Sequence, residues 1–248
     1  MGEFVPELLT LPFLFALGIG FAGGLMQGYT GWGGATLMMP LMTLVYPPVE
    51  ALALLVVGGL LISAQLFPAA VRDFSWKNMR GLLLTLVLLT PIGSIILLHV
   101  DPNLVRKIIG GVIVLVSILA LSGWQYQGKR SGLSTVLFGG IAGIVNGFSG
   151  LGSPILAIYI MAFPGQAGTQ RANLIIATGL IIFTIMIIFS LNGVMVWSLI
   201  FTGILLAPTQ MIGAGIGAKI FAYAPQEYFK KITLIIILMI GSSVIFFS

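Results

Sequence analysis

Long, near-continuous apolar runs cover most of this chain of 248 residues and leave little room for a fold outside a membrane. A helix needs about 20 apolar residues to cross a hydrocarbon core of roughly 30 Å. Eight runs are long enough to consider, at residues 8–46, 49–71, 79–99, 104–123, 133–163, 172–191, 195–221 and 228–247. Because the runs are continuous rather than alternating, they predict an all-α polytopic membrane protein and not a β-barrel.

Composition agrees with lipid as the main solvent. Only 7% of residues are charged and 58% are hydrophobic, whereas about a quarter of a soluble domain is charged. These values exclude a cytosolic enzyme, a nucleic-acid binder and a disordered chain. The chain has no cysteine, which excludes disulfides and thiolate metal sites. No basic residue precedes Arg72, so we expect the first run to be retained rather than cleaved as a signal peptide.

Two of the runs are too long for one helix, and a glycine-rich break interrupts each of them. The segments 20–37 and 139–156 align without a gap, and six of their 18 positions are identical. Three further pairs are chemically similar, namely Gln27 with Asn146, Tyr29 with Phe148, and Thr30 with Ser149. The sequence therefore predicts an internal repeat. Its parts are a first transmembrane repeat at 8–123, a cytoplasmic linker at 124–132 and a second transmembrane repeat at 133–247.

The placement of the basic residues favours one topology for the breaks. If each broken segment crosses once, the Lys and Arg residues divide five inside to six outside. If each is a re-entrant hairpin that returns to its own side, nine lie inside and only Arg106 and Lys107 lie outside. The second division fits the positive-inside rule. It predicts two inverted repeats, each a broken hairpin plus three transmembrane helices, with both chain ends outside.

The breaks are the candidate substrate site. Non-helical backbone at membrane depth must be buried in protein or line a wet cavity, and the helix after each break starts with N–H donors and a partial positive charge. Such an end accepts a small anion, while nearby hydroxyls and amides select it. The candidate residues are Gln27, Gly28, Tyr29, Thr30, Gly31, Trp32, Gly33, Gly34, Asn146, Gly147, Phe148, Ser149, Gly150, Gly152, Ser153, Arg171 and Gln210.

Several of these residues have a second interpretation that stays open. Glycines recur every four residues before each break, up to Gly28 and Gly147, which is also the pattern of close helix packing. Arg171 either faces the cavity or anchors a helix end. Gln210 either faces substrate or satisfies backbone freed by Pro208. The aromatic residues of the breaks are expected to exclude water or gate the site.

What the sequence lacks narrows the function further. It contains no phosphate-binding loop, no zinc motif and no nucleophile–base pair, so we expect no enzyme, no cofactor and no metal. Every Asp and Glu lies in a predicted loop or terminus. The anion is therefore expected to move down its own gradient, or with protons carried on the substrate. A negative-inside potential favours anion exit by about 2.3 kcal/mol per charge per 100 mV.

The paired breaks, the two repeats and the length resemble the sulfite exporter TauE/SafE family of membrane transporters. The resemblance covers nearly the whole chain and implies transport of sulfite, a sulfonate, a sulfoacetate-like compound or a related anion across a bacterial or archaeal inner membrane. Our interpretation is a transporter, favoured as an exporter, that works by alternating access around a midplane site. An anion channel and an uptake permease remain alternatives. The expected partners are the anion and the lipid bilayer, with no nucleic acid, and the oligomeric state stays open, a homo-oligomer included.

Overall fold

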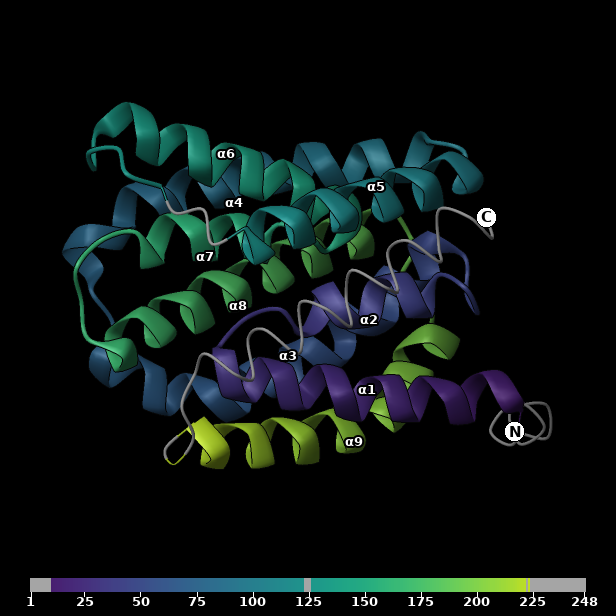
Figure 1. Ribbon diagram of the computed structural model, residues 1–248. Coiled ribbons are helices and arrows are strands. Elements are labelled where there is room, and N and C mark those ends of the chain that lie inside the picture. Colours follow the sequence, from purple (N-terminus) through teal and green to yellow (C-terminus); the bar gives the residue numbers. More distant parts are fainter. Residues whose placement is uncertain (1–9, 123–125, 222, 224–248) are drawn as a thin grey trace.

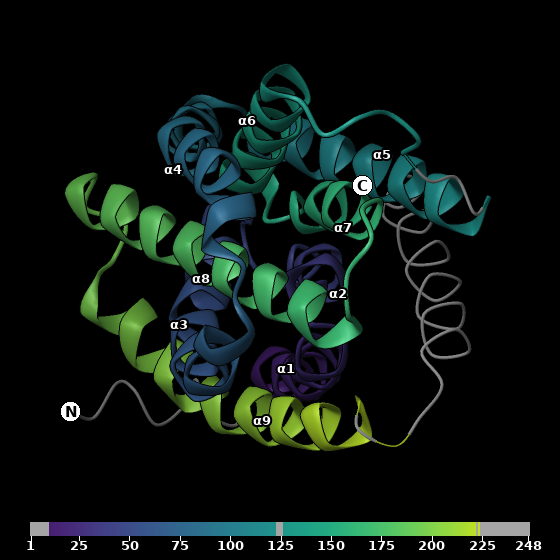
Figure 2. The ribbon, with the colours of Figure 1, turned by 90° about the vertical axis from the view of Figure 1, so that its left-hand side faces the viewer.

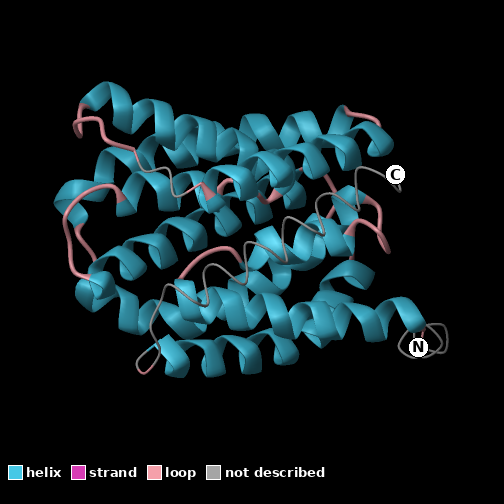
Figure 3. Ribbon diagram, viewed as in Figure 1, coloured by secondary structure: helices cyan, strands magenta, loops and turns pink. Residues whose placement is uncertain are grey.

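The computed structural model describes residues 10–122, 126–221 and 223, and this part of the chain is helical, without strands (Figure 3). The expected run at 228–247 lies outside the described residues. The helices are α1 (Leu11–Thr30), α2 (Gly34–Met42), α3 (Pro48–Asp73), α4 (Trp76–His99), α5 (Pro102–Leu121), α6 (Gly132–Ser149), α7 (Ser153–Met161), α8 (Ala167–Leu191) and α9 (Trp197–Phe221). Both breaks and the five other expected spans in this part of the chain are found where the sequence predicts them.

Six of the described helices are long and apolar enough to cross a membrane: α1, α3, α4, α6, α8 and α9. The fold class is therefore confirmed as an all-α protein with several candidate membrane spans. α1 and α6 are the first parts of the two broken segments, and each is long enough to cross by itself. The expected span at 104–123 corresponds to α5, which is not among the six.

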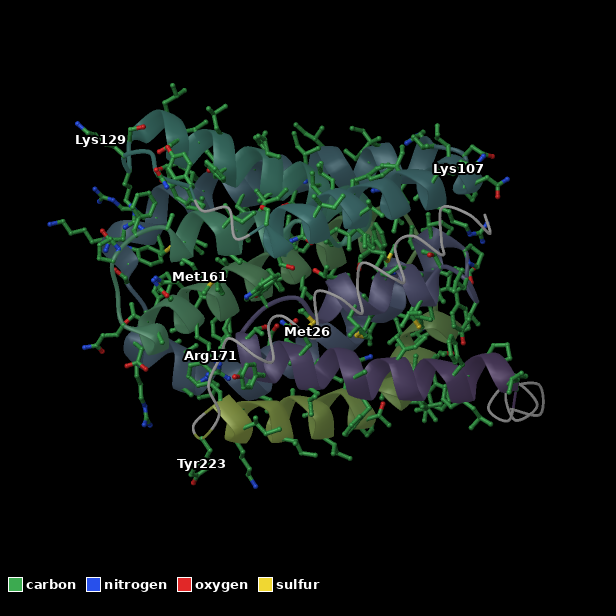
Figure 4. The ribbon with its side chains drawn as sticks, viewed as in Figure 1. Met26, Lys107, Lys129, Met161, Arg171 and Tyr223 are labelled. Atoms are coloured by element: carbon green, nitrogen blue, oxygen red, sulfur yellow. The ribbon has the colours of Figure 1, made fainter. Side chains whose placement is uncertain are left out.

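Each broken segment has one long and one short arm. α1 has 20 residues and α2 has 9, while α6 has 18 and α7 has 9. In Figure 1, α1 runs away from the N-terminal end and α2 runs back toward it. Lys129, just before α6, and Met161, the last residue of α7, lie at the same end of the molecule (Figure 4). Both segments therefore turn back within the bundle.

Local sequence explains where these helices begin and end. Asp101 accepts hydrogen bonds from the first backbone N–H groups of α5, and Ser131 and Ser134 form a reciprocal capping box at the start of α6. Each long arm ends on a glycine in the left-handed conformation, with φ of 81° at Gly31 and 72° at Gly150. Other residues adopt this conformation only at a cost. The breaks are thus encoded by the backbone freedom of glycine.

The long arm of each hairpin packs against a helix of the other half of the chain. α1 lies along α9, α6 lies along α4, and α3 and α8 cross in the centre (Figure 2). A Cβ on Gly28 would lie 2.0 Å from the carbonyl oxygen of Ala214, and one on Gly147 would lie 2.1 Å from that of Thr90. These contacts are with backbone, so they leave no space for a side chain. The packing interpretation of the glycines before the breaks is therefore confirmed.

The outside of the bundle is apolar. Large side chains such as Leu84, Leu88, Phe183 and Ile212 are more than half exposed. In water each such side chain would forfeit roughly 1.5–3 kcal/mol of burial free energy. Their exposure on several different helices fits a surface that faces lipid.

Charged residues lie at the two ends of the bundle, and the two ends differ in sign. Two basic residues, Arg106 and Lys107, lie at the end where α1 begins, with Glu50 and Asp101. The Arg106 side chain donates from Nε to the Thr43 carbonyl oxygen, 3.0 Å away, at the end of α2. Seven described basic residues lie at the other end, namely Arg72, Lys77, Arg80, Lys129, Arg130, Arg171 and Lys219.

Candidate functional site

The first break is closed largely by its own residues. The side-chain oxygen of Gln27, on the last turns of α1, accepts a hydrogen bond of 3.2 Å from the backbone N–H of Gly34 at the start of α2. A Cβ on Gly34 would lie 2.6 Å from that same oxygen, so this close cap requires glycine. Gly31 and Gly33 both have φ of 81°. The expectation that α2 begins with free donors is thus only partly correct, because Gln27 already satisfies the first one.

The second break has the same outline but different side-chain contacts. Asn146 occupies the position of Gln27, but its side chain is one methylene shorter, and it forms no hydrogen bond with any residue that the structure describes. α7 begins with Ser153 and Pro154, and proline has no N–H to offer. A Cβ on Gly152 would lie 2.1 Å from the carbonyl oxygen of Ala142, so this break is folded tightly onto α6.

The two breaks meet at a cavity of about 40 Å³, which is room for a few water molecules. Its polar lining consists of Gln27 from the first break, Asn146 and Ser153 from the second, and Thr178 from α8. The remaining lining side chains are aliphatic residues of α2, α3 and α8, and Gly150 adds backbone. No charged residue lines this central cavity in the described part of the chain.

Two contacts hold the breaks around this central cavity. The hydroxyl of Thr36, on α2, lies 3.4 Å from the hydroxyl of Ser153, on α7, although the residues are 117 positions apart in the chain. The hydroxyl of Thr178 donates to the Gly31 carbonyl oxygen at 3.4 Å. α8 therefore supports the first break from one side, while the two short arms meet on the other.

A second cavity, of about 50 Å³, lies on another side of the first break. Tyr29, Thr30 and Trp32 line it from the break, and Gln170 and Arg171 line it from α8. Arg171 donates from Nη2 to the Gly28 carbonyl oxygen at 2.5 Å. We call this the arginine pocket. It lies toward the basic end of the bundle, where Figure 4 places Arg171.

The predicted site residues thus separate into three groups. The central cavity receives Gln27, Asn146, Gly150 and Ser153, and the arginine pocket receives Tyr29, Thr30, Trp32 and Arg171. The remaining candidates line neither cavity and shape the backbone, the helix packing or the core around them. They are Gly28, Gly31, Gly33, Gly34, Gly147, Phe148, Ser149, Gly152 and Gln210.

Thr30 and Ser149 do not place their hydroxyls in the central cavity as the sequence suggested. The Thr30 hydroxyl donates to the Met26 carbonyl oxygen at 2.8 Å, and the Ser149 hydroxyl donates to that of Val145 at 2.7 Å. Serine and threonine near a helix end commonly bond back to the preceding turn. These two side chains finish the long arms instead of facing the shared space.

Gln210 lies away from both cavities. It is 1% exposed, and its Nε2 has no hydrogen-bond partner among the described residues. A Cβ on Gly58 would lie 2.2 Å from its Oε1, and one on Gly20 would lie 3.0 Å from its Cγ. The amide is therefore packed between α1 and α3, well before the first break.

Thr178 is the lining residue that the sequence interpretation missed. It lies inside the apolar run 172–191, where a single threonine carries no signal of its own. It does, however, follow Arg171 by seven residues, so the two lie on one face of a helix two turns apart. That spacing was the available signal.

Comparison with known proteins agrees with this architecture. The family model for the sulfite exporter TauE/SafE family matches residues 16–244, which include both hairpins and both cavities. No curated relative and no solved structure matches the chain. The family consists of membrane transporters of sulfur-containing anions such as sulfite, and the match spans nearly the whole chain. This multi-pass membrane protein therefore belongs to the sulfite exporter TauE/SafE family.

Proposed function

We propose that this protein exports a small sulfur-containing anion, with sulfite the first candidate, through the central cavity between its two breaks. The observation that carries the proposal is the lining of that cavity. It combines two amides and two hydroxyls with aliphatic walls, inside helices that cross the membrane.

Neutral donors suit a transported anion better than a buried cation would. An amide N–H or a hydroxyl bonds an oxyanion strongly in a low-dielectric site, while a fully buried ion pair leaves one charge exposed to the full desolvation penalty when the partner departs. The amides of Gln27 and Asn146 and the hydroxyl of Ser153 can replace part of the hydration shell of the anion. Because they carry no charge, the empty site stays stable between transport cycles.

The two halves supply a plausible moving part for alternating access. We propose that residues 8–123 and 133–247 are inverted repeats, since both hairpins have one long and one short arm and each long arm packs on the other half. The linker, residues 124–132, would connect them on the cytoplasmic side. Rocking of one half against the other would open the central cavity to each side in turn.

The charge distribution supports an orientation for this motion. Seven described basic residues lie at the end of the bundle that holds the linker, and two lie at the other. By the positive-inside rule, the linker end faces the cytoplasm and α1 begins outside, in a bacterial or archaeal inner membrane. The contact of Arg106 with the end of α2 gives one of the two outer cations a structural role.

Export is the favoured direction because the membrane potential drives an anion outward. A channel is the less favoured alternative, since the central cavity is small and no open path leads through it in the described part of the chain. Uptake of a related anion would use the same site against the potential and would need a steeper concentration gradient.

Binding to the purified full-length protein tests the proposal. Thermal shifts would be measured with sulfite, sulfate, thiosulfate and small sulfonates, for the wild type and for Asn146→Ala. Sulfite should raise the melting temperature of the wild type, and Asn146→Ala should weaken binding about tenfold because one hydrogen bond to a charged group is lost. The chain has no cysteine for sulfite to modify, so the shift reports binding alone.

Ser149→Ala is the matched control, because its hydroxyl lies beside the second break but is bonded to Val145. It should bind sulfite like the wild type. Absence of any sulfite-dependent shift in the wild type would contradict the proposed substrate. Equal loss in Asn146→Ala and Ser149→Ala would move the site away from the central cavity.

A further inference from the structure

The arginine pocket holds a positive charge that the central cavity does not use. Besides Arg171, its polar lining comes from Tyr29, Thr30, Trp32 and Gln170, and Phe221 closes one side. Arg171 is the only charged residue that lines either of these two cavities among the described residues. Its role is therefore not explained by the proposed transport site alone.

The guanidinium group turns inward instead of reaching for water. It donates to the Gly28 carbonyl oxygen on α1 and lies over the ring of Phe221, 4.8 Å from the ring centroid. Its Nε is buried and has no hydrogen-bond partner in the described part of the chain. An arginine that merely anchors a helix end extends its head to the interface, which this side chain does not do.

The cation also lacks an acidic partner. No carboxylate forms an ion pair with Arg171 among the residues that the structure describes. A guanidinium carries five N–H donors in a planar fork that matches two oxygens of an oxyanion, and one printed hydrogen bond uses only a fraction of them. A partly buried charge without a counter-ion is costly, and an anion bound in the pocket would reduce that cost.

The arginine pocket and the central cavity lie one after the other along α8. Arg171 contacts the first break at Gly28, and Thr178, two turns further and about 10 Å along the helix axis, contacts it at Gly31. The first break thus separates the two spaces. Tyr29 and Trp32 line only the arginine pocket side.

We infer that the arginine pocket is a second anion site, which captures the oxyanion at the cytoplasmic entrance before it passes the first break into the central cavity. The ligand class is the same sulfur oxyanion, held by the guanidinium fork of Arg171. This inference rests on the proposed function and on its orientation. It adds that binding from the two faces is unequal, because only the cytoplasmic path passes a cation.

Transport of radiolabelled sulfite measured separately in inside-out and right-side-out membrane vesicles tests this inference. Arg171→Gln should raise the KM at the cytoplasmic face about tenfold, the cost of one charge-assisted bond. The KM at the outer face and the maximal rate should stay near those of the wild type. A purely structural arginine would lower the maximal rate at both faces instead.

Ala167→Glu gives a second variant that keeps Arg171 and its bond to Gly28. Ala167 lines the arginine pocket at the first turn of α8, where an acidic residue favours the helix. Its carboxylate should compete with the anion and raise the cytoplasmic KM. Gln166→Glu adds the same charge one residue earlier, outside the pocket lining, and should change the KM less than Ala167→Glu does.

The outcomes separate this inference from the proposed function. Vesicles of the wild type that do not move sulfite would contradict the proposed function. Wild-type transport with an unchanged cytoplasmic KM in Ala167→Glu and in folded Arg171→Gln would overturn the capture site alone. A change of equal size at both faces, or one confined to the outer face, would also overturn it.

Discussion

The two breaks share a backbone but differ in the chemistry around it. Each ends a long arm on a left-handed glycine, Gly31 or Gly150, and each long arm packs through glycine on the other half. Gly31 lies against Arg171, whereas Gly150 lies against Leu52, a buried aliphatic residue. A repeated sequence has therefore kept the geometry of both hairpins while it has given only the first a cation.

The amide pair shows the same divergence. Gln27 is long enough to cap its own short arm, while Asn146 is one methylene too short and remains available to the central cavity. The first break is held together by its own side chain, and the second offers its side chain to a ligand. We conclude that symmetry sets the shape of the site and that single residues set its chemistry.

Breaking the shared packing should have the largest effect, and an equal one in both halves. Gly28→Ala and Gly147→Ala place a Cβ within about 2 Å of a backbone oxygen on the facing helix, which should cost about 1–3 kcal/mol each. Thermal unfolding in detergent measures this. Gly18→Ala in α1 and Gly132→Ala in α6 are the controls, because a Cβ there meets nothing within 4 Å.

A large loss in only one of those two halves would contradict the common architecture. Unchanged melting temperatures in both would contradict the close contact of each long arm with the opposite half.

The left-handed glycines sharpen the contrast between the breaks. Alanine costs roughly 1–2 kcal/mol in this conformation, and Gly31→Ala adds a contact of 2.9 Å with the Arg171 backbone oxygen. At Gly150 the nearest atom is Leu52 Cδ1 at 3.2 Å, at the end of a side chain that can turn. Denaturation should therefore rank Gly31→Ala as the more destabilised variant, and the reverse order would contradict the asymmetry.

Exchanging the amide lengths should separate stability from binding. Gln27→Asn loses the cap on Gly34 and should lower stability by about 1 kcal/mol. Asn146→Gln keeps every hydrogen bond of the described structure but fills part of a 40 Å³ cavity, so it should weaken sulfite binding with little change in stability. Thermal unfolding with and without sulfite measures both effects, and an equal stability loss in the two variants would count against the comparison.

The smallest expected effect concerns the hydroxyl contact between the short arms. Thr36→Val removes one side of the 3.4 Å contact with Ser153 and should change the affinity for sulfite by about two- to threefold. Thr184→Val serves as control, since the Thr184 hydroxyl bonds only to its own helix at Leu180. A larger effect at Thr184 would show that the contact between the short arms is not special.

Much of the fold could be predicted from the sequence, because long apolar runs and glycine breaks are local signals. The packing role of Gly28 and Gly147 was visible in their spacing. The direction of single side chains was not, because Thr30 and Ser149 had a local partner in the preceding turn. Thr178 and the separation of Arg171 from the central cavity depend on how α8 meets the first break, which is a tertiary contact without a local signature.

A cysteine cross-link between the short arms tests most directly whether the two breaks form one cavity. The chain has no cysteine of its own, so Thr36→Cys with Ser153→Cys gives a single pair, placed where the native hydroxyls are 3.4 Å apart and a disulfide is sterically reasonable. After mild oxidation, cleavage at a protease site inserted in the linker should leave the two halves joined until a reductant is added. Halves that separate without reductant, as they must in each single-cysteine variant, would contradict a shared cavity.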